Sequence, residues 1–255
     1  MAGGSGSRLL PLTKSVNKQL LPIYDKPLIY YPLSTLMLAG IREFMLISNS
    51  SEVSHFQNLL GTGDQFGISI QYGTQDSPGG IAEGFLVAEK FLTGHKVGFI
   101  LGDNLFHGHG LGRKLAEHNE INGARIFAYQ VADPRSYGVV EVDINGRVIS
   151  LEEKPQNPRS NLAVTGLYFY DEEAVQLAKG LKPSARGELE ITDLNRAYLE
   201  RDELSVTILS RGTAWLDTGT FEGLHDASSY IKIVQDRQNL IVGDPFDVAK
   251  NQGWV

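Results

Sequence analysis

The chain alternates between segments with apolar residues at helical spacing and short runs that are almost entirely apolar. Residues 28–40 have helical spacing and end at Gly40, and the β-rich run 42–48 follows. The order helix, strand, helix, strand continues in the segments 53–60, 68–72, 81–91 and 97–101. Short apolar strands that alternate with helices are typical of a parallel sheet covered on both faces.

The pattern changes from about residue 133. Residues 137–155 form two alternating runs around Asn145-Gly146, a strong hairpin signal, and residues 162–171 predict a third strand. An antiparallel part is therefore expected beside the parallel sheet. Further helices are expected at 111–119, 172–179, 189–200 and finally 221–239, with strands at 125–131 and 204–209. No repeat or linker is evident, so the pattern predicts one α/β domain over residues 1–255.

The first 27 residues predict an ordered loop that binds a ligand. They predict neither a helix nor a strand. They combine a glycine cluster, Gly3 to Gly6, with three spaced cations, Arg8, Lys14 and Lys18. Glycines let backbone N–H groups approach a phosphate closely, and an arginine adds a bidentate partner for its oxygens. The cluster is neither a Walker A loop nor a complete GxGxxG motif, so a flexible tail is the alternative.

Composition narrows the possible functions. The 255 residues carry a formal charge of −7, so a phosphate ligand must be met by local cations and not by a general positive field. No cysteine is present, which excludes disulfides, thiol catalysis and cysteine-ligated metals. No apolar run is long enough to cross a bilayer and no signal peptide is visible, so a cytoplasmic location is expected, without nucleic-acid or membrane partners.

Two aspartates stand where a metal ligand would be useful. Asp103 follows the apolar strand 97–101, and Asp217 follows a second short apolar run. Ligands of open α/β sheets bind beyond the carboxyl ends of strands, and Mg²⁺ prefers carboxylate oxygens. A turn residue that caps its own backbone is the alternative for each. His107 and His109 lack a third ligand and are interpreted as part of a glycine-rich turn.

Taken together, the motifs resemble the glucose-1-phosphate thymidylyltransferases of the sugar nucleotidylyltransferase family. The resemblance covers nearly the whole chain in order, in the blocks AGGSGSRLLPLT, NKQLLPIYDKPLIYYPLSTLMLAGI, LGDNLFHGH, YGVVEVD, SLEEKP, AVTGLYFYD, LKPSARGELEITDLN and AWLDTGT. It implies a Rossmann-like, mostly parallel sheet flanked by helices, with an inserted antiparallel β part that binds the sugar. It also implies Mg²⁺ dependence, a homotetramer and a product used in deoxysugar synthesis.

The resemblance also assigns site residues. Those implied in catalysis are Arg8, Lys18 and Lys154. Those implied in nucleotide binding are Gly3, Gly4, Ser5, Gly6, Gln19, Gln75 and Gly80. Those implied in binding the sugar phosphate are Tyr137, Gly138, Glu153, Lys154, Val164 and Tyr168, and the implied magnesium ligands are Asp103 and Asp217.

Individual roles follow from the same resemblance. Arg8 would lie at the leaving pyrophosphate and Lys18 near the reacting phosphates. Gln75 and the backbone of Gly80 would contact the thymine edge, while Lys154 would bind the sugar phosphate and Glu153 its hydroxyls. The implied reaction joins dTTP and glucose-1-phosphate into dTDP-glucose and pyrophosphate. It needs no protein nucleophile, because the attacking phosphate is already ionised.

Three departures from the family pattern leave alternatives open. The family's first apolar strand and its C-terminal tail are expected to be missing, which would leave backbone groups of the sheet unpaired. The segment after Gln75 also differs, with acidic residues at Asp76 and Glu83 and extra glycine. A uridylyltransferase that uses UTP and an inactive sugar-nucleotide-binding fragment are therefore the alternatives.

Overall fold

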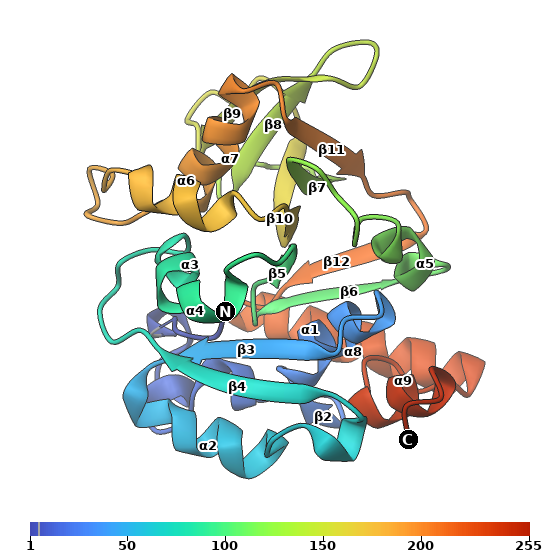
Figure 1. Ribbon diagram of the computed structural model, residues 1–255. Coiled ribbons are helices and arrows are strands. Elements are labelled where there is room, and N and C mark those ends of the chain that lie inside the picture. The colour runs from blue at the N-terminus through green and yellow to red at the C-terminus, as the bar shows by residue number, and fades with distance from the viewer. Residues whose placement is uncertain (5) are drawn as a thin grey trace. The chain divides into compact units, whose positions relative to one another are not determined.

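The computed structural model describes residues 1–4 and 6–255 and divides them into two compact units (Figure 1). The first unit consists of Met1–Asp76, Ile100–Ala116 and Gly212–Val255, and the second of Ser77–Phe99 and Glu117–Arg211. The two units thus interleave along the chain. The single domain expected over residues 1–255 stays a prediction.

The first unit contains five α-helices among its described residues: α1 Tyr30–Leu38, α2 Ser50–Leu60, α5 Leu111–Ala116, α8 Phe221–Gln238 and α9 Pro245–Asn251. Its short 3₁₀ helices are η1 Ser7–Leu9, η2 Leu12–Lys14, η3 Lys18–Leu20 and η4 Asp64–Phe66. Its strands are β1 Pro22–Ile23, β2 Lys26–Pro27, β3 Glu43–Ser48, β4 Ser69–Thr74, β6 Asn104–Gly108 and β12 Thr213–Asp217.

The strands of this unit pair in twos. β3 and β4 are parallel and lie side by side next to α2 (Figure 1), whereas β1–β2 and β6–β12 are antiparallel. The first residues join β3 to the segment after β5: Ala2 N donates to Ile47 O (2.6 Å), and Gly102 N donates to Met1 O (2.8 Å). Backbone groups expected to be unpaired at this place are therefore partly bonded.

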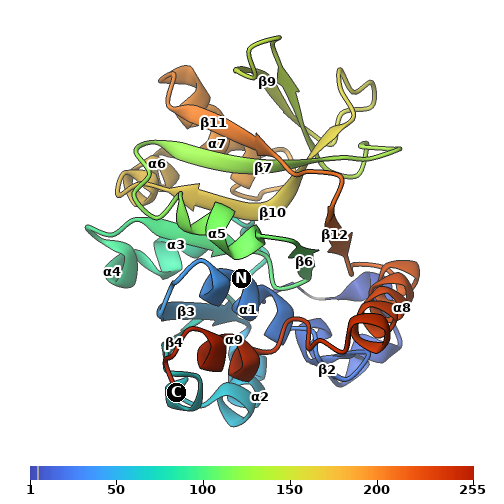
Figure 2. The same cartoon turned by 90° about the vertical axis from the view of Figure 1, so that its right-hand side faces the viewer.

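The core of the first unit forms between the long helix α8, α1 and the strands β1 and β6. Figure 2 shows α8 with β12 beside it. Tyr31 of α1 is buried and donates its hydroxyl to Ile23 O at 2.8 Å, so the ring fills the core while its polar end is satisfied. The buried residues of this cluster are Ile23, Leu28, Tyr31, Leu105, Ala227, Ile231, Val234 and Val242.

Several sequence predictions for this unit are corrected. The segment 1–27 contains the helices η1 to η3 and the pair β1–β2 and is not wholly loop. The glycine-rich turn expected around His107 is the strand β6, which pairs with β12 about a hundred residues later in the chain. α8 is also not the last helix, because α9 follows with Asp244 as its N-cap and Pro245 at its first position.

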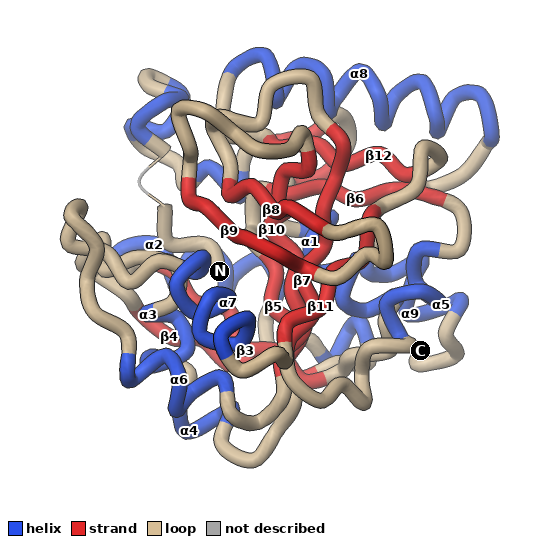
Figure 3. The backbone as a smooth tube through the Cα atoms, turned by 90° about the horizontal axis from the view of Figure 1, so that it is seen from above, coloured by secondary structure: helices blue, strands red, loops and turns tan. Residues whose placement is uncertain are grey.

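The second unit is built on a sheet in the order β11-β7-β10-β8-β9, with β5 also paired to β10 (Figure 3). Its strands are β5 Val97–Ile100, whose last residue belongs to the first unit, β7 Ala124–Gln130, β8 Gly138–Val142, β9 Val148–Glu153, β10 Leu162–Tyr170 and β11 Leu204–Ile208. Its helices are α3 Glu83–Val87, α4 Glu89–Leu92, α6 Ala174–Gly180 and α7 Ile191–Glu200.

β10 is the centre of this sheet, and every one of its residues is buried. It is antiparallel to β7 and β8, whereas β7 and β11 are parallel, so the sheet is mixed. The predicted hairpin is confirmed as β8–β9, with Gly146 at φ 81° in the turn. The single helix expected over 81–91 is instead broken at Ala88 into α3 and α4. The predicted α/β fold class with an antiparallel part is confirmed. The expectation of a mostly parallel sheet is corrected, because β3–β4 and β7–β11 are parallel whereas β1–β2, β6–β12, β7–β10, β8–β10 and β8–β9 are antiparallel.

Among the described residues, no helix combines the length and the apolar character that spanning a membrane requires.

Candidate functional site

Asp103 and Lys18 form a close ion pair in the first unit. Asp103 lies between β5 and β6, and Lys18 opens η3, whose N-cap Asn17 accepts a hydrogen bond from Gln19 N (2.9 Å). Lys18 Nζ lies 2.5 Å from Asp103 Oδ2, with the two side chains 8% and 18% exposed. Burial alone would raise the pKa of Asp103, but the Lys18 ammonium and the Asn104 amide hold it below its usual value. Asp103 is therefore a carboxylate at neutral pH.

Asp217 is brought to Asp103 by the pairing of β6 with β12. In that pairing Asp217 stands opposite Asn104, the neighbour of Asp103. Thr218 fixes the junction, because its N–H and its hydroxyl both donate to Asp103 O, at 3.0 and 2.8 Å. Burial and the negative charge of Asp103 raise the pKa of Asp217. Two carboxyl groups that disfavour each other's ionisation in this way attract an added cation.

Gly219 places Asp217 next to Arg8. Its N–H donates to Asp217 Oδ1 (2.9 Å), which holds the carboxyl group beside Gly219. A Cβ atom on Gly219 would lie 3.0 Å from both Asp217 Oδ1 and Arg8 Nη2, which is tighter than most Cβ contacts in proteins. Arg8 therefore contributes a cation next to the second aspartate.

We expect Gly219→Ala to lower the rate of the reaction implied by the family resemblance about tenfold, because the added methyl group displaces Asp217 and Arg8 from their positions. The melting temperature should change little, since the crowded atoms are the ends of side chains. Gly212→Ala is the matched control, because a Cβ there meets nothing within 4 Å. Equal rates for the two variants would contradict the placement of Arg8 and Asp217 in the site.

The glycine loop leaves room for a ligand near its start. A Cβ on Gly4 would meet nothing within 4 Å, and one on Gly3 would lie 3.6 Å from Gln75 Oε1. Gly6 has a φ of 61°, and its carbonyl accepts from the Thr13 hydroxyl at 2.7 Å, so its own conformation requires glycine. Ser5, which the sequence assigns to nucleotide binding, lies outside the described residues.

Gln19 carries a polar atom that the surrounding protein does not satisfy. Its side chain is buried against Gly102, and among the described residues Oε1 has no hydrogen-bond partner. A buried amide oxygen without a partner costs free energy that a donor on a bound ligand would recover. This property fits the predicted role of Gln19 in nucleotide binding.

The donor atoms around Asp103 and Asp217 fit Mg²⁺. Mg²⁺ is usually bound by one or two carboxylates together with substrate phosphates and waters, and not by a cage of protein side chains. No cluster of three or more histidine, aspartate or glutamate ligands occurs in residues 1–4 and 6–255. A pair of neighbouring aspartates beside cations suited to phosphate is consistent with a metal bound jointly with a substrate.

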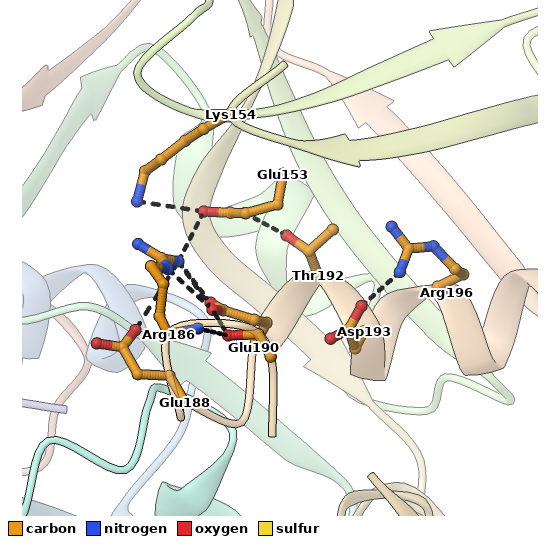
Figure 4. Close-up of polar contacts among 9 residues, drawn as sticks. Glu153, Lys154, Arg186, Glu188, Glu190, Thr192, Asp193 and Arg196 are labelled. Atoms are coloured by element: carbon orange, nitrogen blue, oxygen red, sulfur yellow. Dashed lines mark hydrogen bonds and ion pairs between the residues drawn. The ribbon is translucent and has the colours of Figure 1, made fainter. Parts of the chain in front are cut away.

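In the second unit, Glu153 and Lys154 lie in a charged cluster at the end of β9 (Figure 4). Glu153 Oε1 is 3.2 Å from Lys154 Nζ and 3.6 Å from Arg186 Nη2, and Glu153 Oε2 accepts from the Thr192 hydroxyl at 2.5 Å. Arg186 also donates to both oxygens of the nearly buried Glu190, at 2.9 and 2.8 Å. The cations Lys154 and Arg186 thus lie next to the Glu153 carboxylate, which Thr192 holds in place.

The remaining sugar-site residues of the sequence prediction surround Glu153. Gly138 stands opposite Glu153 in the β8–β9 pairing, and a Cβ on it would lie 3.6 Å from Glu153 Oε2 and 3.7 Å from Val164 Cβ. Tyr168 is buried, and burial together with the Glu153 charge raises the pKa of its hydroxyl. Lys154 has a φ of 45° and donates its N–H to Tyr137 O (3.0 Å), a strained conformation of a kind that is common at ligand sites.

Gly80 has a structural reason to be glycine within the second unit. Its φ is 95°, and a Cβ on it would lie 2.3 Å from Leu189 O. Leu189 N donates to Gly79 O at 2.7 Å, which holds the two backbones together. Gly80 therefore joins its loop to the segment before α7, while Gln75 belongs to the first unit.

The sequence predictions fall into two groups. The first unit contains Gly3, Gly4, Gly6, Arg8, Lys18, Gln19, Gln75, Asp103 and Asp217, and the second contains Gly80, Tyr137, Gly138, Glu153, Lys154, Val164 and Tyr168. Sequence reasoning assigned no role to Arg186, Glu190 or Thr192. The Arg186–Glu190 spacing of four residues is a weak ion-pair signal, whereas Thr192 meets Glu153 only through the fold. His107 lies 2.7 Å from the Tyr230 hydroxyl, in line with a structural role.

The chain is similar to several known proteins. Residues 1–233 match the family model described as nucleotidyl transferase. The chain is 55% identical to the glucose-1-phosphate thymidylyltransferase of Neisseria meningitidis, over all of this chain and 89% of the relative. It is 51% identical to the Mycobacterium tuberculosis enzyme of the same name, over all of this chain and 88% of the relative.

Two solved structures are also similar. One is a Bacillus anthracis protein assigned as a glucose-1-phosphate thymidylyltransferase and solved with sucrose, with TM-score 0.85 and 38% identity over 96% of both chains. The other is a UDP-glucose pyrophosphorylase with UDP-glucose, with TM-score 0.81 and 25% identity over 91% of this chain and 97% of that one. This chain belongs to the nucleotidyl transferase family and, within it, to the glucose-1-phosphate thymidylyltransferases.

Proposed function

We propose that this enzyme makes dTDP-glucose and pyrophosphate from dTTP and glucose-1-phosphate. An oxygen of the sugar phosphate attacks the α-phosphorus of the nucleotide in line, the new P–O bond forms, and the bond to the β-phosphate breaks so that pyrophosphate leaves. The protein's task is to align two polyanions and to neutralise their charge. The substrates named for relatives at 50–55% identity over the whole chain support this choice.

The observation that carries the proposal is the group formed by Lys18, Asp103, Asp217 and Arg8. It combines cations with two adjacent carboxylates, of which one is held ionised by a buried lysine. We propose that Asp103 and Asp217 hold Mg²⁺, which would neutralise phosphate charge during transfer. Lys18 would then bind the reacting phosphates and Arg8 the leaving pyrophosphate.

In the first unit, the glycine loop with Gly3, Gly4 and Gly6 would bind the nucleotide phosphates. The unsatisfied Oε1 of Gln19 would accept a hydrogen bond from the bound nucleotide. Gln75 and the backbone of Gly80 are assigned to the base. In the second unit, Lys154 would bind the phosphate of the sugar, with Arg186 adding positive charge nearby. Glu153 would accept from sugar hydroxyls, and Tyr137, Gly138, Val164 and Tyr168 would shape the surroundings.

The experiment is a pyrophosphate-release assay of the purified 255-residue chain with glucose-1-phosphate and Mg²⁺, comparing dTTP, UTP, ATP, CTP and GTP. We expect release with dTTP to exceed release with the other nucleotides. A preference for UTP would overturn the proposed recognition of the thymine base, while the reaction would still be a nucleotidyl transfer. No release with any nucleotide, from a chain that melts cooperatively, would reject the proposed function.

Removal of the metal provides a separate prediction. Treatment with EDTA is expected to reduce the dTTP-dependent rate at least about a hundredfold, because a bound divalent cation supplies several kcal/mol of charge stabilisation in such transfers. Added Mg²⁺ in excess of the chelator should restore the rate, which controls for damage to the protein. A rate unchanged by EDTA would contradict the assignment of Asp103 and Asp217 as metal ligands.

The resemblance extends this proposal to a homotetramer in the cytoplasm whose product enters deoxysugar synthesis, such as the dTDP-rhamnose pathway. Light scattering of the purified chain measures the number of subunits directly. A monomer at assay concentration with full activity would reject a required tetramer.

A further inference from the structure

Glu153 is held differently at its two carboxylate oxygens. Oε2 accepts the Thr192 hydroxyl at 2.5 Å, while Oε1 faces the cations Lys154 and Arg186 at 3.2 and 3.6 Å (Figure 4). The side chains of these cations are 48% and 47% exposed. One oxygen therefore has a buried neutral partner, and the other faces two half-exposed cations, of which Arg186 is also bonded to Glu190.

Thr192 is well suited to hold a carboxylate in place. It is buried, at 3% exposure, in the first turn of α7. Its β-branched side chain has few rotamers, so the hydroxyl position is set by the helix. Asp193 and Arg196 of the same helix form an ion pair, and the Arg196 guanidinium donates to Leu151 O of β9 at 3.2 Å. That bond connects α7 to the strand that carries Glu153.

The anchor acts against a competing attraction. Without the Thr192 hydroxyl, Oε2 as well as Oε1 of Glu153 would be free to turn toward Lys154 and Arg186, because charge-assisted bonds are the stronger ones. Such a move would use up both the acceptor needed for sugar hydroxyls and the cations needed for phosphate. A carboxylate has about four acceptor positions, so one bond from Thr192 leaves acceptors on Glu153 for a sugar.

Gly138 packs beside the anchored oxygen. A Cβ on it would be in ordinary contact with Thr192 Oγ1 (3.4 Å) and Glu153 Oε2 (3.6 Å). With glycine at position 138, no side-chain methyl group lies against these two oxygens. Thr192 Oγ1 donates its own proton to Glu153 and so can present only an acceptor to whatever binds there.

We propose that Thr192 is a positioning residue for sugar recognition: it fixes Oε2 of Glu153, so that only Oε1 pairs with the cations that bind the phosphate and the carboxylate keeps acceptor positions for the hydroxyls of the hexose phosphate. This inference rests on the proposed function, since it takes Glu153 as a sugar ligand. Loss of the Thr192 hydroxyl is therefore expected to weaken binding of the sugar phosphate and to leave nucleotide binding unchanged.

The test compares Thr192→Val, which keeps the shape but removes the hydroxyl, with Thr192→Ser, which keeps the hydroxyl. We expect Thr192→Val to raise KM for glucose-1-phosphate about tenfold, with KM for dTTP unchanged, as for loss of a hydrogen bond to a charged group. Thr192→Ser should recover most of the affinity. Thr165→Val is the matched control, because Thr165 is equally buried in the same unit but donates to Phe127 O. Its KM for glucose-1-phosphate should stay near that of the wild type.

Two further measurements separate the possible failures. Glu153→Gln alone must raise KM for glucose-1-phosphate; if it does not, the sugar assignment in the proposed function fails. In the Glu153→Gln background, Thr192→Val should add less than about twofold, because the two residues act through one contact. A full tenfold effect in that background, or an unchanged KM in Thr192→Val alone, would overturn the positioning role.

A panel of monodeoxyglucose-1-phosphates reports on the direction of the carboxylate. The wild type should discriminate against the analogue that lacks the hydroxyl bound by Glu153, and Thr192→Val should lose much of that discrimination. A purely structural role of Thr192 would instead lower kcat/KM equally for every member of the panel. That pattern would count against the inference.

Discussion

Replacing Asp103 with asparagine is expected to reduce dTTP-dependent pyrophosphate release by about a thousandfold while the chain stays folded. The substitution keeps the shape of the side chain and its position between β5 and β6 but removes a charge next to Asp217. Both the proposed metal and the position of Lys18 depend on that charge. Steady-state rates at saturating Mg²⁺, with circular dichroism to confirm folding, provide the measurement.

The first unit contains a matched control for this experiment. Asp25 also pairs with a buried lysine, Lys26, at 2.5 Å, but it lies between β1 and β2 and also accepts from Gln235 Nε2. Asp25→Asn should therefore disturb a similar ion pair without affecting the chemistry. If Asp25→Asn lost as much activity as Asp103→Asn, general damage to the unit would explain both results.

Substitution of Lys18 by methionine is expected to affect both stability and turnover. The remaining Asp103 carboxylate would be largely buried without its counterion, which should lower the free energy of unfolding by about 3 kcal/mol. Turnover should fall by at least about a hundredfold, because the cation proposed to bind the reacting phosphates is gone. Urea denaturation and the pyrophosphate assay measure the two effects separately.

The double variant Lys18→Met with Asp103→Asn distinguishes these effects. Without either charge, no uncompensated carboxylate remains, so the double variant should unfold at a higher urea concentration than Lys18→Met alone. Its turnover should remain as low as that of either single variant. A double variant as unstable as Lys18→Met would show that the loss of stability has a source other than the uncompensated charge of Asp103.

The elements that the sequence predicts well are those whose signals are local. The apolar run before residue 48 appears as β3, and Asn145-Gly146 forms the turn of the β8–β9 hairpin. The strands β6 and β12 were missed because their pairing partners are remote. Trp215 Nε1 donates to Asn104 Oδ1 at 2.6 Å across that pair, a contact that no local pattern encodes.

In the candidate site, too, residues with a local sequence signal were predicted, whereas contacts that only the fold creates were not. Asp103 and Asp217 were chosen one by one from their places after apolar runs, but only the β6–β12 register makes them neighbours. The choice of sugar-site residues depended on the family resemblance, because a Glu-Lys pair at a strand end is usually a solvated turn. Thr192 was not chosen, since a threonine in the first turn of a helix has many ordinary uses and its bond to Glu153 spans 39 positions.

Because the two units interleave along the chain, the ribosome completes the second unit before the first. The last residue of the second unit, Arg211, is synthesised before β12 and leaves the ribosome before it. The second unit can therefore fold on the nascent chain while the first still lacks the partner strand of β6. Asp103 is made early, but Asp217 joins it only after the whole second unit has emerged. The residues proposed to bind the sugar are thus in place on the nascent chain before the pair of aspartates is complete, and the proposed catalytic group forms only late in translation.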